Sequence, residues 1–459
     1  MADWLQPALT YARSWLQFQH RVHDLPGLQC AIRGDGKVLL DLAIGKASLA
    51  SGAPLTSDTR LRVASHSKTF TAFGVMKLVD QGRLRLDDKA GQHVTGLHPD
   101  TADATIAQLL SHSAGIIRDG TDAGQWQGRR DFLNEAELRA ALADAPLIPA
   151  NTRFKYSNHG FGLLGLIIEA VTGEPYATWM AREVVSPAGL AATMPDAPVP
   201  EGTPLADGHG NKLLLGKRFV VPMAQGTGAL AAATGFVSTA KDLTALIAQL
   251  DPAAPASILS VGSRREMVRR HWKVLDSVID RHYGLGTIHG GNGDWAWYGH
   301  SGVFPGCFSH TCIVPAAGLT LSVIINAPDV VPATLVEGLI EILKVFKANG
   351  APAATLAPWT GRWWSMWGPV DLLAVGNKVI VAVPGQANPF TDASEIVEVK
   401  GNVGIVGKAT GFTNYRETAR LETDGSGKPV ALWLGGIKLL PEAEAAAETG
   451  AKFQVAATT

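Results

Sequence analysis

Three short motifs in this chain hold residue types that together could transfer an acyl group. They are Ser65-His66-Ser67-Lys68, Tyr156-Ser157-Asn158 and His300-Ser301-Gly302. A serine hydroxyl becomes a strong nucleophile only when a base takes its proton. Residues three apart share one face of a helix, so Lys68 can lie beside Ser65 on the next turn. The set therefore predicts a serine hydrolase with Ser65 as nucleophile.

Lys68 and Tyr156 are the two candidate proton carriers. A free lysine is mostly protonated at neutral pH, but burial disfavours the ammonium form and makes the amine available as a base. A phenol near a lysine can exist partly as phenolate, so the sequence leaves open which of the two is the acylation base, and the pair can titrate as one unit. Asn158 offers an amide that can hold Lys68 and touch a substrate carbonyl.

The segment from His300 to Val303 is expected to be an edge strand beside the nucleophile. A backbone N–H of this strand, together with the N–H of Ser65 at its helix start, would form an oxyanion hole. His300, Ser301, Gly302 and Val303 are therefore the candidate substrate-binding residues. The alternative for His300 is a structural histidine that only satisfies the backbone of its strand.

Two of the motifs have a second copy, and the surrounding sequence separates the copies. Ser238-Thr239-Ala240-Lys241 is another S-x-x-K, but Thr239 to Asp242 has the form of a capping box before an apolar helix, so Ser238 is expected to be an N-cap. His289 lies in His-Gly-Gly-Asn-Gly, which is typical of a surface turn. Ser65 instead opens a helical pattern that ends at Asp80-Gln81-Gly82.

The elements that must position these residues can be outlined from the hydrophobic pattern. Helical spacing begins the chain, and strands are expected at 28–32 and 38–44, joined by a turn at Gly34-Asp35-Gly36. Helices dominate from Ser65 to about Leu250, strands return between 283 and 325, and an apolar helix stripe runs from Leu335 to Phe346. This order predicts an α+β fold in which one antiparallel sheet, built from distant parts of the chain, has flanking helices and a helical lobe.

The ordered motifs resemble those of the penicillin-binding-protein and serine β-lactamase superfamily. The likeness is greatest to the branch with class C β-lactamases, D-aminopeptidases and related esterases, and it extends over roughly residues 3 to 347. Residues 105–116 and 154–165, and Gly299-His300-Ser301-Gly302 with Pro305-Gly306, carry it further. The resemblance implies that Ser65 is acylated, that Lys68 and Tyr156 carry protons, and that the Val303 N–H completes the oxyanion hole.

One departure from that family bears on the substrate. Many β-lactamases and transpeptidases have K-T-G where this chain has His300-Ser301-Gly302, and a mostly neutral histidine binds a substrate carboxylate less well than lysine. The expected activity is therefore hydrolysis of peptide or amide bonds in small substrates, including peptides of D-amino acids. A carboxylesterase is the alternative, a β-lactamase is less favoured, and a non-catalytic binding protein is least favoured because Ser65, Lys68 and Tyr156 are all present.

The sequence pattern changes after Lys347. Residues 348–357 have the composition of a linker between a catalytic domain, 1–347, and a small β-rich domain, 358–459. The start, Trp359 to Trp363, resembles the opening strand of lipocalin-like barrels, and the tail after Pro441 is expected to fray. The cluster of Trp363, Trp364 and Trp367 is expected to fill the barrel core; the alternative is that a loop of this domain reaches over the active site.

Composition limits the partners. The 459 residues include 40 basic and 41 acidic side chains, for a formal net charge of −1, which gives no sign of nucleic-acid binding or of a polybasic membrane contact. The first residues lack the pattern of a secretory signal, so a cytoplasmic location and a small-molecule or short-peptide partner are expected. Cys30, Cys307 and Cys312 have no metal spacing and are expected to be buried, and we expect neither metal nor cofactor.

Overall fold

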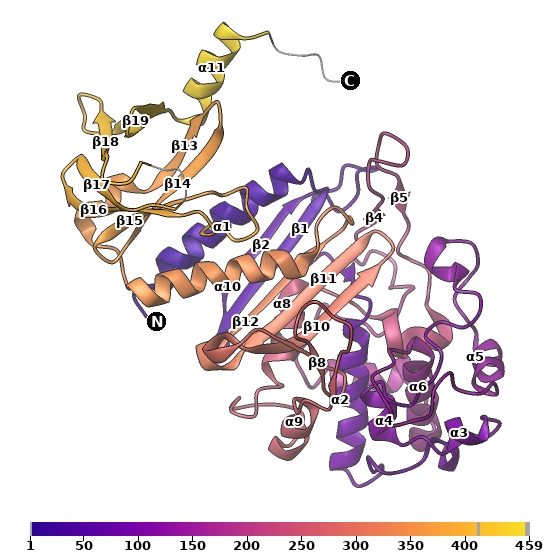
Figure 1. Ribbon diagram of the computed structural model, residues 1–459. Helices are drawn as coiled ribbons and strands as arrows, with labels where there is room; N and C mark the ends of the chain where they lie inside the picture. Colours follow the sequence, from indigo (N-terminus) through magenta and orange to yellow (C-terminus); the bar gives the residue numbers. More distant parts are fainter. Residues whose placement is uncertain (1, 411–413, 455–459) are drawn as a thin grey trace. The chain divides into compact units, whose positions relative to one another are not determined.

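The computed structural model describes residues 2–410 and 414–454, and these form two structural units (Figure 1). One unit is His23–Val336, and the other joins Met1–Val22 to Glu337–Thr459. The domain boundary at residue 347 and the linker at 348–357 remain predictions. Within the described residues, no helix is long and apolar enough to cross a membrane.

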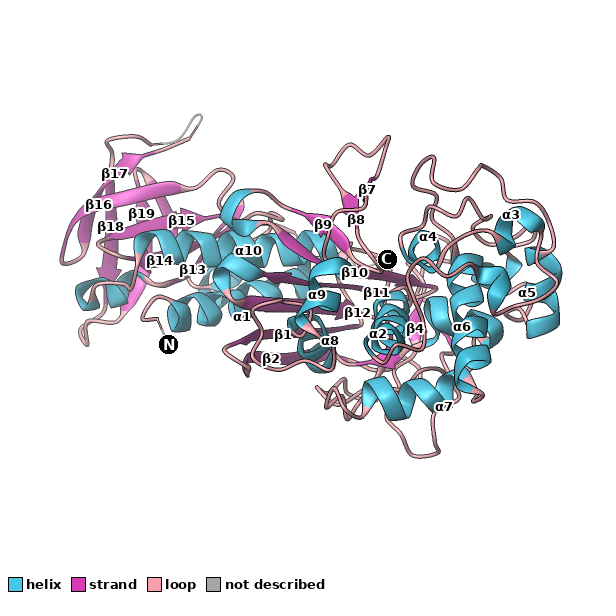
Figure 2. Ribbon diagram, turned by 90° about the horizontal axis from the view of Figure 1, so that it is seen from below, coloured by secondary structure: helices cyan, strands magenta, loops and turns pink. Residues whose placement is uncertain are grey.

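The unit 23–336 is built around an eight-stranded antiparallel sheet, which Figure 2 shows with helices against it. The strand order is β2 (Lys37–Gly45), β1 (Gly27–Gly34), β12 (Leu319–Ile325), β11 (Cys307–Val314), β10 (Trp297–Phe304), β9 (Ile288–Gly290), β8 (His282–Tyr283) and β7 (Trp272–Lys273). Leu28 of β1 pairs with Ile325 of β12, so the sheet joins the two ends of this unit. The prediction of one antiparallel sheet from distant parts of the chain is confirmed.

The hairpin of β1 and β2 follows from its turn residues. Asp35 and Gly36 have φ of 48° and 71°, and two successive left-handed residues make the turn whose twist matches that of paired strands. Aspartate and glycine tolerate this conformation better than other residues. The predicted turn is therefore confirmed, one residue shorter than expected.

A helical lobe lies beside the sheet. Its helices are α2 (His66–Asp80), α3 (Pro99–Ala102), α4 (Ile106–Leu110), α5 (Glu135–Leu142), α6 (Asn158–Thr172), α7 (Tyr176–Met180) and α9 (Val261–Met267). Helix α2 is buried on almost every side, packs against α6 and β10, and stacks Phe70 on Phe236 with ring centroids 4.1 Å apart. Helix α8 (Ala240–Ala248) packs instead on β1, β11 and β12. Helix α2, which begins directly after Ser65, is therefore held rigidly from several sides.

Two pairs of short strands complete this unit. β3 (Leu61–Arg62) pairs with β6 (Val237–Ser238), and β4 (Gly208–His209) pairs with β5 (Val220–Val221). The first pair places the residues just before Ser65 against the residues just before α8. The chain that leads into α2 is thereby fixed to the rest of the unit.

The second unit contains α1 (Leu5–Val22), most of α10 (Pro332–Asn349), and an eight-stranded antiparallel barrel. The barrel strands follow chain order: β13 (Gly361–Ser365), β14 (Gly368–Val375), β15 (Lys378–Ala382), β16 (Ser394–Lys400), β17 (Val403–Lys408), β18 (Thr418–Thr423), β19 (Pro429–Leu434) and β20 (Ile437–Leu439). Trp364 and Leu440 exchange two backbone hydrogen bonds of 2.7 and 2.9 Å, which join the last strand to the first. The predicted barrel-like domain is confirmed.

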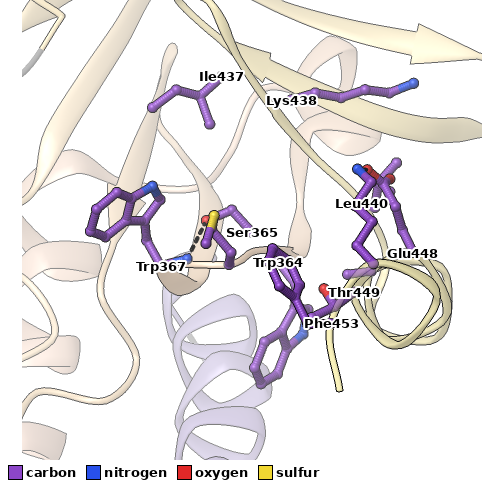
Figure 3. Close-up of a pocket in the computed structure, with 12 residues that line it drawn as sticks. Trp364, Ser365, Trp367, Ile437, Lys438, Leu440, Glu448, Thr449 and Phe453 are labelled. Atoms are coloured by element: carbon purple, nitrogen blue, oxygen red, sulfur yellow. Dashed lines mark hydrogen bonds and ion pairs between the residues drawn. The ribbon is translucent and has the colours of Figure 1, made fainter. Parts of the chain in front are cut away.

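The tryptophans at the start of the barrel do not act as one cluster. Trp363 is buried in the barrel core, but Trp364 is half-buried and Trp367 is 87% exposed. The expectation that all three fill the core is wrong for Trp367, because Gly368 turns the chain out of the strand before it re-enters at β14. Figure 3 shows Trp364 and Trp367 beside a hollow of about 300 Å³ with Ile437 and Phe453.

The segment after Pro441 differs from its expectation of fraying. It forms α11 (Glu442–Lys452), and Glu442 receives two hydrogen bonds from the guanidinium of Arg21 at 3.1 and 2.6 Å. Acidic residues in the first turn and Lys452 in the last also suit the helix dipole. Residues 455–459 lie outside the described part of the chain.

Candidate active site

Ser65 stands at the N-terminus of α2 on a strained turn. Ala64, directly before it, has φ of 46°, a left-handed conformation that is unfavourable for alanine. The fully buried Arg62 holds the preceding strand: it forms an ion pair of 2.9 Å with Asp196 and donates to the carbonyl of Gly235 at 2.6 Å. The packing thus fixes the direction in which the Ser65 hydroxyl points.

The structure brings the predicted proton carriers to that hydroxyl. The phenol of Tyr156 donates to Ser65 Oγ at 2.7 Å, and Lys68 Nζ lies 3.2 Å from the same oxygen. Tyr156 precedes α6, where Ser157 caps the helix by accepting from the Gly160 N–H at 2.8 Å. Residues at the starts of two helices, α2 and α6, therefore contact one oxygen atom, Ser65 Oγ.

The hydrogen bonds of Lys68 account for all the hydrogens of a neutral amine. Its Nζ donates to Asn158 Oδ1 at 2.7 Å and to the Ala233 carbonyl at 2.9 Å, and both oxygens can only accept. An uncharged amine has two hydrogens and one lone pair, so the lone pair remains for the proton of Ser65. Burial lowers the pKa of Lys68 well below its ordinary value, and the nearby Arg118 lowers it further while Asp119 raises it.

Asp119 sets the orientation of Asn158, a role that no motif of the sequence indicates. Asn158 Nδ2 donates to Asp119 Oδ1 at 2.6 Å, and the indole of Trp126 donates to the same oxygen at 3.0 Å. Since a carboxylate accepts only, the amide nitrogen of Asn158 must face Asp119 and its oxygen must face Lys68. Asp119 is therefore a positioning residue that acts on the base through Asn158.

Tyr156 lies in an aromatic pocket that disfavours its ionisation. The ring of His112 lies 4.2 Å from that of Tyr156, and Lys68 Nζ lies 4.7 Å from the phenol ring centroid. Burial raises the pKa of Tyr156, so the free site holds it as phenol. His112, expected to support the site rather than bind a ligand, accepts from the Ser157 N–H at 3.1 Å.

Both ring nitrogens of His300 are occupied by neighbouring groups. Nδ1 lies 2.7 Å from the Ser301 carbonyl, which can only accept, so Nδ1 carries the hydrogen. Nε2 lies 2.9 Å from the hydroxyl of Tyr283, which donates to it when the ring is neutral. Burial lowers the pKa of His300 well below its ordinary value, so this residue places no positive charge where K-T-G enzymes place one.

β10 presents an open edge beside the nucleophile. β9 pairs with β10 only through Trp297 to Gly299, so the edge beyond residue 299 has no partner strand there. Phe304 and Cys307 flank a two-residue hairpin turn and form its hydrogen-bonded pair, so the N–H of Phe304 points to β11. Successive residues of a strand direct their N–H groups to opposite edges. The N–H of Val303 accordingly points to the open edge.

Gly302 allows β10 to approach the nucleophile segment. A Cβ atom at this position would lie 2.0 Å from the Val63 carbonyl oxygen, which is backbone and cannot yield. The neighbouring Ser301 hydroxyl lies 2.7 Å from His310 Nδ1. Any side chain at residue 302 would therefore push the open edge away from Ser65.

These groups line one cavity of about 520 Å³. Ser65, Tyr156, Asn158, His300, Ser301 and Val303 reach it, whereas Lys68 lies behind Ser65, fully buried. In the described part of the chain, no group of three or more His, Cys, Asp or Glu side chains could hold a metal ion. The cavity wall presents the hydroxyls of Ser65, Tyr156 and Ser301 and the amide of Asn158.

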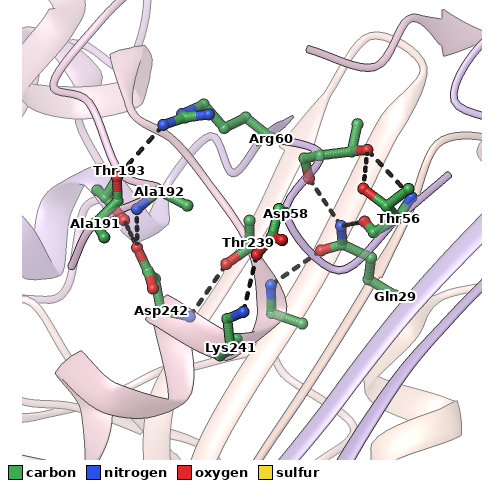
Figure 4. Close-up of polar contacts among 12 residues, drawn as sticks. Gln29, Thr56, Asp58, Arg60, Ala191, Ala192, Thr193, Thr239, Lys241 and Asp242 are labelled. Atoms are coloured by element: carbon green, nitrogen blue, oxygen red, sulfur yellow. Dashed lines mark hydrogen bonds and ion pairs between the residues drawn. The ribbon is translucent and has the colours of Figure 1, made fainter. Parts of the chain in front are cut away.

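The second S-x-x-K has a structural role, as Figure 4 shows. Thr239 is the N-cap of α8: its side chain accepts from the Asp242 N–H at 3.2 Å. The N-cap is thus Thr239 and not Ser238, whose hydroxyl lies 2.7 Å from that of Thr193. The lysine of this second motif, Lys241, forms a surface ion pair of 2.9 Å with Asp58.

The second histidine motif also differs from its expectation. His289 is buried in β9 and pairs with Tyr298 of β10, so it belongs to the sheet and not to a surface turn. Gly290 still belongs to β9, and the turn begins at Gly291. Cys30, Cys307 and Cys312 are buried, as expected.

Comparison with known proteins places this geometry in a family. The family model described as Beta-lactamase matches residues 17–339. The chain belongs to this family. Penicillin-binding protein 4 of Amycolatopsis lactamdurans is 29% identical over 343 residues, which cover 66% of the chain and 81% of that protein. Protein flp of Staphylococcus aureus strain COL is 31% identical over 180 residues, so the match spans only 36% of that relative's length and 37% of this chain.

Solved structures agree with this assignment. SurE covers 94% of the chain and 99% of its own, with a TM-score of 0.62 and 25% identity. The octameric penicillin-binding protein homologue from Pyrococcus abyssi covers the same shares, with a TM-score of 0.65 and 22% identity. A D-stereospecific amidohydrolase from Streptomyces sp. covers 71% of the chain and 97% of its own, with a TM-score of 0.59 and 25% identity. The fold is that of the penicillin-binding-protein and serine β-lactamase superfamily.

Proposed function

We propose that this member of the β-lactamase family is a serine hydrolase that forms an acyl-enzyme at Ser65 and cleaves amide or peptide bonds of small substrates, including those of D-amino acids. One observation carries the proposal. Ser65 Oγ has a phenol at 2.7 Å and the amine of Lys68 at 3.2 Å, and the same amine also contacts Asn158 Oδ1 and the Ala233 carbonyl, while burial lowers its pKa. Such an oxygen can lose its proton to Lys68 and still keep a hydrogen bond from Tyr156.

Acylation then follows from these contacts. Ser65 Oγ attacks the carbonyl carbon while its proton moves to the Lys68 lone pair. The carbon–nitrogen bond breaks as the Tyr156 phenol gives its proton to the leaving nitrogen. The new ammonium of Lys68 stabilises the phenolate, because it lies 4.7 Å from the ring centroid.

Deacylation reverses the same transfers. A water molecule gives its proton to the Tyr156 phenolate and attacks the ester carbon. The bond to Ser65 Oγ breaks, and this oxygen regains its proton from Lys68. The enzyme thus returns to a neutral amine and a neutral phenol, and the product is a carboxylic acid.

The oxyanion of both steps would be held by two backbone donors, the N–H groups of Ser65 and Val303. Val303 lines the cavity on the open edge of β10, and the Gly302 contact keeps this edge close to Ser65. Backbone donors fixed in this way need no reorganisation when the charge develops. Removal of the close approach at Gly302 would therefore weaken the oxyanion hole.

Two relatives support the choice of amide substrates. The Streptomyces protein at 25% identity is described as a D-stereospecific amidohydrolase, and SurE, also at 25% identity, has been solved with D-Leu. Neutral His300 argues against β-lactam substrates that depend on a lysine to bind their carboxylate. An ester is the easier substrate for the same residues, because its leaving group needs less protonation.

The test is to measure initial hydrolysis rates of wild type, Ser65→Ala and Ser238→Ala on one chromogenic panel. The panel holds D- and L-alanine p-nitroanilides, p-nitrophenyl butyrate and a chromogenic cephalosporin. We expect cleavage of the D-anilide that Ser65→Ala abolishes and Ser238→Ala retains. Cleavage of the ester alone would identify a carboxylesterase, and cephalosporin turnover would contradict the role given to His300.

A further inference from the structure

The charged side chains that line the active-site cavity are of one sign, positive. Among the residues that line it, Arg118 is the only lysine or arginine, and none is an aspartate or glutamate. His300 is fully buried beside Tyr283 and the Ser301 carbonyl, and burial lowers its pKa well below the ordinary value, so it carries no charge at neutral pH. A substrate with a free ammonium group would meet no carboxylate on these walls, whereas an anionic group would meet one guanidinium.

Arg118 is held in place before any substrate arrives. Its carbonyl accepts from the N–H groups of Asn158 and His159 at the start of α6, at 2.9 and 3.3 Å. Its Nε lies 3.1 Å from Asp119 Oδ2, and its guanidinium carbon lies 5.6 Å from the centroid of the Tyr156 ring. The ion pair is made through Nε of the guanidinium, and the Arg118 side chain as a whole is 66% exposed.

The wall of the cavity is largely apolar. The apolar residues that line it are Trp126, Ile288, Val303, Phe304, Pro305, Phe308 and Pro328. Trp126 and Phe304 contact edge to face at 6.0 Å, and Phe132 stacks behind Phe304 at 5.9 Å. This packing gives a rigid apolar surface on which a hydrocarbon or aromatic part of a substrate can lie.

We propose that Arg118 determines specificity by binding an anionic group of the substrate, so that preferred substrates carry a carboxylate together with an apolar group. The inference rests on the proposed function and names its substrate class. Arginine suits this task because its planar fork presents paired donors to a carboxylate. Since Arg118 also stacks near the Tyr156 ring, an anion bound there lies next to the reacting centre.

Two matched substrate pairs test this. In the first, mono-p-nitrophenyl glutarate is compared with p-nitrophenyl valerate, so the carboxylate lies on the acyl side. In the second, 3-carboxy-4-nitrophenyl butyrate is compared with p-nitrophenyl butyrate, so it lies on the leaving group. The quantity measured is kcat/KM for the anionic member divided by that for the neutral member, and any change in the pKa of Lys68 cancels in this ratio.

We expect Arg118→Gln to lower this ratio about tenfold for one pair, the size of a lost charged hydrogen bond. Arg118→Lys should retain part of the preference, and Arg153→Gln, at a surface arginine that pairs with Asp276, should leave the ratio at the wild-type value. A ratio that Arg118→Gln leaves unchanged in both pairs would overturn the assignment while the proposed function stands. Neutral esters that wild type and Ser65→Ala cleave equally would instead overturn the proposed function, and this inference with it.

Discussion

The substitution Asp119→Asn tests whether a neutral Lys68 is the base and whether Asp119 controls it. Asparagine can keep the acceptor that Asn158 and Trp126 share, but its NH2 group would then replace the oxygen that pairs with Arg118, so this ion pair is lost. The geometry around Lys68 should be retained while one negative charge is lost. That charge raises the pKa of Lys68, so its removal lowers the pKa.

The size of the shift can be worked out from the hydrogen bonds. Lys68 Nζ lies 2.7 Å from one end of the Asn158 amide, and Asp119 Oδ1 lies 2.6 Å from the other. With the width of the amide added, the two charges lie within about 8 Å of each other. At an effective dielectric constant of 20, a unit charge at this distance contributes about 2 kcal/mol. This corresponds to about 1.5 pH units.

The assay is the pH dependence of kcat/KM for p-nitrophenyl butyrate. Activity rises as pH passes the pKa of a base that must be neutral, so the acidic limb marks Lys68 in the free enzyme. In Asp119→Asn this limb should move to lower pH by about 1.5 units. Asp276→Asn is the matched control, because Asp276 is an exposed carboxylate paired with Arg153 and its φ of 59° suits asparagine.

The result can also refute the reasoning. An acidic limb that stays in place in a folded Asp119→Asn protein would show that Lys68 is not the group titrated, or that Asp119 does not act on it. A limb that moves to higher pH would have the wrong sign for the loss of a negative charge. A matching shift in Asp276→Asn would show that the overall charge of the protein, and not this contact, is measured.

Two further predictions concern the proton path and the second S-x-x-K. Tyr156→Phe should lower the acylation rate for amides by at least about a hundredfold, since it removes the acid that protonates the leaving nitrogen, and should lower the acylation rate for p-nitrophenyl esters less. Equal losses of the acylation rate for both substrates, measured by single-turnover stopped-flow kinetics, would remove Tyr156 from this role. Thr239→Ala should reduce the free energy of unfolding by about 1 kcal/mol, measured by urea denaturation, with kcat/KM unchanged, because Thr239 caps α8. Loss of activity in Thr239→Ala or in Ser238→Ala without loss of stability would show that the second S-x-x-K takes part in catalysis, which contradicts its structural role.

The sequence could predict the parts of this site that are carried by local spacing. Ser65 and Lys68 lie one helical turn apart, and Tyr156 and Asn158 frame the start of α6, so the structure brings all four together. The antiparallel sheet and the barrel also follow from hydrophobic periodicity and turn residues. The roles of these residues in catalysis remain part of the proposal.

The sequence could not predict the contacts that depend on chain segments meeting in space. Asp119 lies in a loop without periodicity, and only the packing of this loop on α6 places it against Asn158. Tyr283 likewise lies 2.9 Å from His300 Nε2, a contact between residues of two strands that no local motif indicates. The strand β14 escaped prediction because Gly368 and Pro369 at its start are typical of a turn.

Arg118 and Asp119 are adjacent, yet they act on Lys68 in opposite directions, and this links substrate binding to the base. The guanidinium lowers the pKa of Lys68, and the carboxylate raises it. An anion bound at Arg118 would offset the guanidinium charge, so the pKa of Lys68 should be higher in the complex than in the free enzyme. The acidic limb of kcat reports the complex and that of kcat/KM the free enzyme. For mono-p-nitrophenyl glutarate the acidic limb of kcat should therefore lie at higher pH than that of kcat/KM. For p-nitrophenyl valerate the two limbs should coincide. Coincidence for both esters would show that substrate binding at Arg118 does not change the pKa of Lys68.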